Sequence, residues 1–168
     1  MNTHQILSKD IAYKKIQRMA YEIAEKNFNE KQIILAGIKE NGSIIATILL
    51  SFLKDIFKGE ILILEILIDK KNPKKVSLSE QLNFDNKVII VVDDVANSGR
   101  TLLYALKPFL EFYPKKIQTL VLVERSYKEF PISADYVGLS VSTAFTEKII
   151  VETEQDQITG ASLATLDN

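Results

Sequence analysis

Apolar residues recur along this chain with two spacings that alternate from the N-terminus onwards. They fall at helical spacing in Lys9–Asn27, and they cover one broad helical face in Ser43–Phe57. The short run Ile33–Ile38 between these helices is almost wholly apolar, and Ile61–Ile68 is a second such run. Runs of this length, bounded by turn residues, are typical of strands buried on both faces. The first half of the chain therefore predicts the order helix, strand, helix, strand.

The second half continues this alternation. Gly99–Tyr113 has a helical pattern, which Pro108 is expected to bend or restart. The stretch Asp69–Asn86 contains Pro73 and many polar residues, so it is expected to be mostly loop. Three further strands are predicted, namely Lys87–Asp94, Ile117–Glu124 and the shorter Ala134–Gly138.

Strands that alternate with helices and read as apolar runs predict an α/β fold with a doubly wound, mainly parallel sheet of five strands. A length of 168 residues without a low-complexity linker favours a single domain over residues 1–168. Ser140–Val151 is strand-like, whereas the polar tail Gln155–Asn168 is expected to be partly disordered. Ligands of such sheets bind beyond the carboxyl ends of the strands, so functional residues are expected just after each strand.

Composition and charge argue against several classes of protein. The chain has no cysteine, which excludes disulfides and thiolate metal sites. Its one histidine, His4, argues against a His-rich metal centre or a catalytic triad, and the net charge of −1 does not indicate a strongly basic surface for nucleic acid. No apolar run is long enough to span a bilayer, and Met1–Asp10 lacks the apolar core of a secretory signal, so a cytoplasmic location is expected.

The segment from Val91 to Thr101 carries the most specific chemistry. An apolar strand delivers Asp93 and Asp94, whose carboxylates suit hydroxyl donors such as a ribose diol. A loop of small and polar residues then leads into a helix, and Gly99 permits a positive φ and the close approach of a ligand. Main-chain N–H groups at such a loop and helix start can bind anions. The ordered combination predicts a site for a sugar that carries a phosphate group.

Three other interpretations of these motifs are weaker. Gly37–Ser43 has the two glycines of a triphosphate-binding loop but lacks the lysine that follows the second glycine in such loops. The Gly-x-Gly-x-x-Gly fingerprint of a dinucleotide site does not occur. A receiver-like domain could use Asp93 and Asp94 for metal binding and phosphorylation. However, its acid pair follows the first strand, whereas here the pair follows the third, and the loop Ala96–Thr101 would have no role.

Val91–Thr101 resembles the motif with which type I phosphoribosyltransferases bind 5-phosphoribosyl-1-pyrophosphate (PRPP). Two further segments, Ile33–Gly42 and Leu120–Val151, are similar to the bifunctional pyrimidine-operon attenuator/uracil phosphoribosyltransferase family, and the N-terminal helix matches that family in pattern. The resemblance covers most of residues 5–155. It implies the type I phosphoribosyltransferase fold, with a small hood formed by the N-terminal segment and about residues 139–152.

The resemblance also implies roles for individual residues. Asp93 and Asp94 hold the ribose hydroxyls, act in catalysis together with Lys39, and contact Mg²⁺ weakly, mostly through the substrate. Tyr136 and Val137 contact the base. The 5′-phosphate is bound by Ala96, Asn97, Ser98, Gly99, Arg100 and Thr101, and the pyrophosphate by Lys39, Glu40, Asn41 and Gly42.

The implied reaction transfers the phosphoribosyl group of PRPP to a nucleobase and releases pyrophosphate, with Mg²⁺ as cofactor. Uracil is the first expectation for the base and a purine the second. Related transferases commonly form dimers or tetramers, so a homodimer or homotetramer is expected.

Two departures from the family favour an alternative function. Asn41 stands where the family's pyrophosphate loop carries an arginine. The stretch Asp69–Asn86 is shorter than the family's catalytic loop, and its lysines, of which Lys70 is the first, either replace part of the missing charge or form an ordinary solvated loop. These departures suit a regulator that senses PRPP or a nucleotide, turns over weakly and binds pyrimidine-operon RNA.

The residues expected to face RNA match the family only in part. Arg18 and Lys148 fit its pattern, whereas Tyr21 and Tyr127 stand where histidines are expected. RNA is therefore not the favoured partner.

Overall fold

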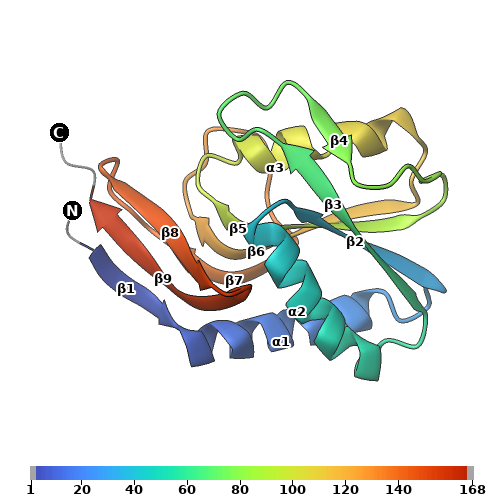
Figure 1. Cartoon of the computed structure of the whole chain (residues 1–168), viewed down its shortest axis with the longest axis horizontal. Coiled ribbons are helices and arrows are strands. Elements are labelled where there is room, and N and C mark those ends of the chain that lie inside the picture. Colours follow the sequence, from blue (N-terminus) through green and yellow to red (C-terminus); the bar gives the residue numbers. More distant parts are fainter. Residues whose placement is uncertain (1–2, 166–168) are drawn as a thin grey trace.

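A mainly parallel sheet of six strands forms the centre of the computed structural model, which describes residues 3–165 (Figure 1). The order across the sheet is β4-β3-β2-β5-β6-β7, and β4 runs antiparallel to its neighbour β3. The strands are β2 (Gln32–Ile38), β3 (Glu60–Ile68), β4 (Val76–Leu78), β5 (Val88–Ala96), β6 (Lys116–Arg125) and β7 (Tyr136–Val141). The five predicted strands are confirmed. The count of five is corrected to six, because the expected loop Asp69–Asn86 contains β4.

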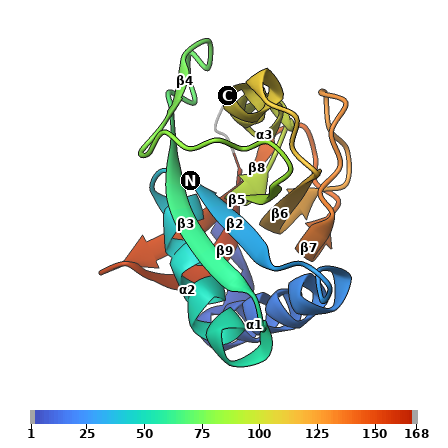
Figure 2. The ribbon, with the colours of Figure 1, turned by 90° about the vertical axis from the view of Figure 1, so that its right-hand side faces the viewer.

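Helices cover both faces of this sheet, as a doubly wound fold requires (Figures 1 and 2). α1 (Lys9–Lys26) and α2 (Asn41–Ile56) lie on one face, and the short α3 (Arg100–Ala105) and the 3₁₀ helix η1 (Lys107–Glu111) lie on the other. Side chains alternate along β5, so that Ile90 and Val92 pack into the α1 and α2 layer while Ile89 and Val91 pack into the opposite layer. This double burial explains why the central strands are uniformly apolar.

The predicted helix Gly99–Tyr113 is interrupted. Its α-helical part ends at Ala105, and η1 begins at Lys107 with Pro108 in its first turn. Proline has no N–H for an interior helical bond but fits the start of a helix, so the expected restart at Pro108 is confirmed.

A second, antiparallel sheet of three strands lies beside the carboxyl ends of the central strands (Figure 1). Its order is β1-β9-β8, with β1 at Thr3–Ser8, β8 at Glu147–Glu154 and β9 at Gln157–Thr165. The expectation of a partly disordered tail was therefore wrong for Gln157–Thr165, because these residues pair with strands on both sides. The rest of that tail, 166–168, lies outside the described residues. That the small sheet serves as a hood stays a prediction.

The connections of the sheet define where a ligand can enter. The chain leaves β2 towards β3 on one side, and it leaves β5 towards β6 on the other side, although β2 and β5 are neighbours. This change of direction opens a crevice at the carboxyl ends of β2 and β5, which is where open α/β sheets bind ligands. Within residues 3–165, none of the helices combines the length and hydrophobicity needed to span a membrane.

Candidate functional site

A cavity of about 310 Å³ lies at this crevice. The carboxyl end of β5, the loop and helix start that follow it, and the strand β8 form most of its wall, and Asn41 and Lys70 enter from two other segments. All eight residues predicted to bind the sugar and its 5′-phosphate line it, namely Asp93, Asp94, Ala96, Asn97, Ser98, Gly99, Arg100 and Thr101. The structure therefore brings the acid pair, Asp93 and Asp94, and the loop predicted to bind the 5′-phosphate, Ala96–Thr101 (the phosphate loop), to one hollow.

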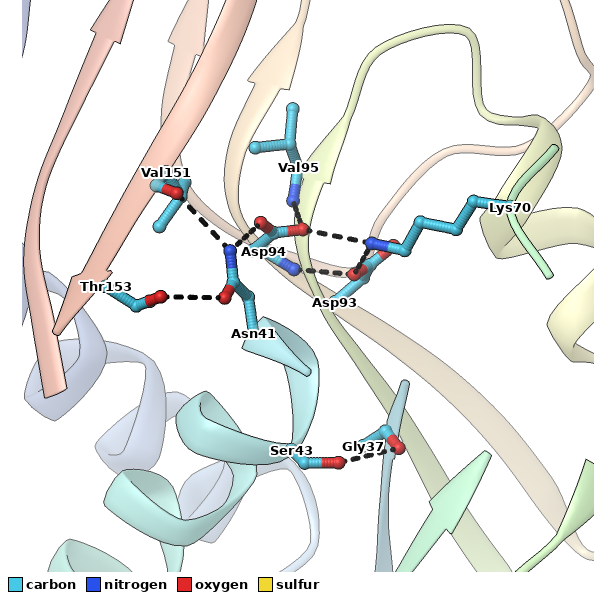
Figure 3. Close-up of polar contacts among 9 residues, drawn as sticks. All are labelled: Gly37, Asn41, Ser43, Lys70, Asp93, Asp94, Val95, Val151 and Thr153. Atoms are coloured by element: carbon cyan, nitrogen blue, oxygen red, sulfur yellow. Dashed lines mark hydrogen bonds and ion pairs between the residues drawn. The ribbon is translucent and has the colours of Figure 1, made fainter. Parts of the chain in front are cut away.

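Each of the two acids near the end of β5 accepts a hydrogen bond from the main-chain N–H of the residue that follows it (Figure 3). The N–H of Asp94 donates to Asp93 Oδ1 at 2.9 Å, and the N–H of Val95 donates to Asp94 Oδ1 at 2.8 Å. The ammonium of Lys70 lies 3.4 Å from Asp93 Oδ1 and 3.7 Å from Asp94 Oδ1. One cation thus contacts both carboxyl groups.

The charges of this cluster depend on burial as well as on contact. Burial raises the pKa of the Asp93 carboxyl well above its usual range, and the Asp94 charge adds to the rise while Lys70 opposes it. Burial lowers the pKa of Lys70, but the Asp93 and Asp94 carboxylates outweigh it, and the net shift is upward. Asp93 is therefore the acid whose ionisation the fold resists, and Lys70 stays a cation.

This raised pKa predicts a dependence of stability on pH. Unfolded aspartate loses its proton near pH ~4, so above that pH the unfolded chain binds fewer protons than the folded one and stability falls as pH rises. Asp93→Asn removes the ionisable group and keeps the acceptor for the Asp94 N–H. We expect its melting temperature to exceed that of the wild type at pH 8 and to match it near pH ~4. A variant that melts lower than the wild type at pH 8 would contradict this expectation.

The phosphate loop presents main-chain donors that the protein leaves free. Among residues 3–165, no hydrogen-bond acceptor is found for the N–H groups of Asn97, Ser98 and Gly99. Gly99 has φ +84°. The loop is anchored at the Ser98 carbonyl, which accepts hydrogen bonds from the N–H groups of Glu129 and Phe130, both at 3.0 Å. Since α3 spans only six residues, an anion bound here would depend more on the loop amides than on the dipole of the helix.

The residues that follow β2 line two different hollows. Asn41 lines the cavity with the acids, whereas Lys39 and Glu40 line a neighbouring hollow together with Glu65. Gly42 packs against β5, since a Cβ there would lie 2.5 Å from the Val92 carbonyl oxygen. Asn41 thus lies at the acid pair. Lys39, the third predicted catalytic residue, lines the neighbouring hollow and not the cavity.

The structure does not bring the two predicted base-contacting residues to the cavity. Tyr136 is fully buried at the start of β7, where its hydroxyl donates to Gln118 Oε1 at 2.8 Å and burial raises its pKa to about 12. Val137 follows it, and neither residue lines the cavity. Both residues lie at the start of β7, whereas the sheet geometry leads us to expect ligands near its carboxyl end at Val141, so the base contact at Tyr136 and Val137 stays a prediction that this cavity does not support.

Residues of the predicted hood (about 139–152) also line the cavity, although none of them was predicted as a residue of this site. Lys148, Ile149, Ile150 and Val151 of β8 line the cavity, although β8 is distant from the acid pair in sequence. Tyr127 and Phe145, which do not line the cavity, form an exposed aromatic pair with ring centroids 6.3 Å apart, in the loops that follow β6 and β7. The rule that ligands bind after strand ends, applied to β6 and β7, was the signal that could have found this pair.

Comparisons with known proteins agree with this geometry. The family model of the phosphoribosyl transferase domain matches residues 2–157. The chain is 34% identical over 149 residues to the Bifunctional protein PyrR of Haemophilus ducreyi, with 83% of each chain covered. It is 38% identical over 149 residues to that of Enterococcus faecalis, with 83% of this chain and 84% of the relative covered.

Solved structures share the fold at low sequence identity. A hypoxanthine-guanine phosphoribosyltransferase of Bacillus anthracis superposes with a TM-score of 0.75 at 22% identity, covering 98% of this chain and 100% of that chain. The hypoxanthine phosphoribosyltransferase of Trypanosoma cruzi gives a TM-score of 0.77 at 18% identity, covering 93% of this chain and 94% of that chain.

Proposed function

The chain belongs to the phosphoribosyl transferase domain family, and we propose that this phosphoribosyltransferase binds PRPP with Mg²⁺ and transfers the phosphoribosyl group to a nucleobase, uracil first among them. One observation carries the proposal. A pair of acids and a loop with unpaired main-chain N–H groups line the same cavity, so hydroxyl groups and a phosphate of one sugar can be bound together.

The described residues fit Mg²⁺ that is held mostly through the substrate. No group of three or more metal-ligating side chains occurs among residues 3–165, so this part of the chain builds no dedicated metal cage. Asp93 and Asp94 are two carboxylates at the cavity, and Mg²⁺ commonly binds one or two carboxylates together with substrate phosphates. The ion would supply positive charge to the pyrophosphate oxygens as the leaving group departs.

The residues of the chain contribute by orientation and by charge. The transition state at the sugar carbon resembles an oxocarbenium ion, as in other glycosyl transfers. The loop amides and Arg100 hold the 5′-phosphate, while the acids hold the ribose, so the anomeric carbon stays in place as the bond to pyrophosphate breaks. Lys70 contacts both acids and can offset the charge of the leaving group. The Tyr127 and Phe145 rings offer apolar faces for a base at the same end of the sheet.

Turnover of a panel of bases tests the proposal. We expect pyrophosphate release from PRPP with Mg²⁺ to require a base and to be fastest with uracil, and chelation of Mg²⁺ to stop it. Adenine, hypoxanthine and guanine are the comparison set. Faster release with a purine would overturn the choice of uracil, and release with no base in the panel would overturn the transferase reaction.

A regulatory role is the second candidate, because the relatives named above are bifunctional proteins. A chain that binds PRPP but turns over no base would favour this role, and retention of leader RNA on a filter would then identify RNA as its partner. Arg18 donates to Glu22 and to the carbonyls of Val137 and Gly138, so much of its hydrogen-bonding capacity is used within the protein. The expected homodimer or homotetramer and the cytoplasmic location stay predictions.

A further inference from the structure

We infer that Asn41 is a positioning residue, which holds the Asp94 carboxylate and strand β8 in one arrangement across the cavity. The inference rests on the proposed function, because it concerns how the site binds the ribose. It gives Asn41 a role other than the pyrophosphate contact that the resemblance implies.

The contacts of Asn41 join three parts of the site (Figure 3). Its Nδ2 donates to Asp94 Oδ2 at 2.7 Å and to the Val151 carbonyl oxygen at 3.3 Å. Its Oδ1 accepts a hydrogen bond from Thr153 Oγ1 at 3.2 Å. Asn41 begins α2, Asp94 lies near the carboxyl end of the central strand β5, and Val151 and Thr153 belong to β8. A single amide therefore links the central sheet to the small sheet.

The chemistry of the carboxamide suits this position. Asparagine offers two N–H donors and one carbonyl acceptor, and the structure uses both kinds of group. Arginine has donors only and could not accept from Thr153, while aspartate has acceptors only and would repel Asp94. Asn41 is therefore not a partial substitute for an arginine, because it makes a set of contacts that arginine cannot make.

The local main chain directs Asn41 towards the acids. Glu40, directly before it, has φ +76°, a conformation that side-chain-bearing residues rarely adopt. Gly42, directly after it, lets α2 start against β5, where a Cβ would overlap the Val92 carbonyl. Main-chain strain of this kind is commonly kept at functional sites, where the surrounding structure enforces it.

Two consequences for ligand binding follow. Asp94 has one carboxylate oxygen fixed by the Val95 N–H and the other by Asn41, so its plane is set before a sugar arrives. The same amide sets how far β8 stands from the acids, and β8 supplies Lys148, Ile149 and Ile150 to the cavity wall. Loss of Asn41 should therefore weaken ribose binding without touching a pyrophosphate contact.

Calorimetry with two probes tests this role. Ribose 5-phosphate carries the ribose and the 5′-phosphate, and inorganic pyrophosphate carries only the leaving group. We expect Asn41→Ala to weaken ribose 5-phosphate binding about tenfold, since the lost bond is to a charged group. Pyrophosphate binding should not change, and in turnover assays the KM for PRPP should rise more than kcat falls.

Thr153 provides a second variant that does not touch the ligand. Thr153→Val removes the donor to Asn41 Oδ1, so it should weaken ribose 5-phosphate binding about threefold. The double variant should bind no more weakly than Asn41→Ala alone, because both changes disrupt one connection. Thr165→Val, at an exposed threonine of β9, is the matched control and should bind as the wild type does. Melting temperatures verify that each variant folds.

The outcomes separate the inference from the function on which it rests. Unchanged ribose 5-phosphate affinity in Asn41→Ala, with a wild type that binds this probe, overturns the inference alone. A loss of pyrophosphate affinity only would assign Asn41 to the leaving group and also overturns it. A wild type that binds neither probe overturns the proposed function, and the inference with it.

Discussion

Gly99→Val is expected to weaken PRPP binding by about a hundredfold or more. Gly99 has φ +84°, and a left-handed main chain costs a residue with a side chain roughly 1–2 kcal/mol, more when the residue is β-branched. A Cβ there would also lie 2.9 Å from Ile132 Cγ2 and 3.6 Å from Phe130 Cβ. A shift of the loop that relieves both problems would displace the N–H groups expected to bind the 5′-phosphate, and calorimetry with PRPP would measure the loss.

Gly99→Asn separates the two causes. Asparagine tolerates positive φ far better than valine does, but it carries the same Cβ. A loss with asparagine that is clearly smaller than with valine would attribute the effect to the main-chain conformation, and equal losses would attribute it to the contact with Ile132. PRPP affinity that stays at the wild-type level in Gly99→Val would remove the phosphate loop from the proposed site.

The parts of the fold that were predictable are those in which local pattern and burial agree. The run around Ile90 is apolar at every position because both faces of β5 are covered, so a strand and a doubly wound sheet followed directly. β4 and β9 were missed for a different reason. β4 is only three residues long and pairs with β3, the strand before it, whereas β9 pairs with β8 and with the distant β1. Pairing defines both strands, and neither has a distinctive local pattern.

The candidate site, like the fold, could be predicted from the sequence only in part. Asp93 to Thr101 are contiguous, and the chemistry of a sugar phosphate can be recognised in their order alone. Lys70 and β8 come to the cavity through the tertiary fold, and no spacing in the sequence joins them to the acids. The sequence also could not show that Tyr136 begins β7 and Val141 ends it, so it could not show that Tyr136 lies away from this cavity.

Asp94→Asn is expected to weaken PRPP binding by about a hundredfold or more and to lower turnover in proportion. Asp94 accepts from the Val95 N–H through one oxygen and from Asn41 Nδ2 through the other. A carboxamide of the same shape places an N–H₂ group against one of these donors whichever way it is turned, so one contact becomes repulsive. It also removes the charge that Lys70 contacts at 3.7 Å and that ribose hydroxyls would use.

Asp55→Asn, at an exposed position of α2, makes the same chemical change away from the cavity and is the matched control. Calorimetry with PRPP and a pyrophosphate-release assay on both variants would measure the difference. Asp93→Asn provides a further comparison, because the fold resists ionisation of Asp93 and its amide variant keeps the acceptor for the Asp94 N–H. If Asp94→Asn bound PRPP as tightly as Asp55→Asn does, the carboxylate that the protein fixes from two sides would have no part in holding the sugar.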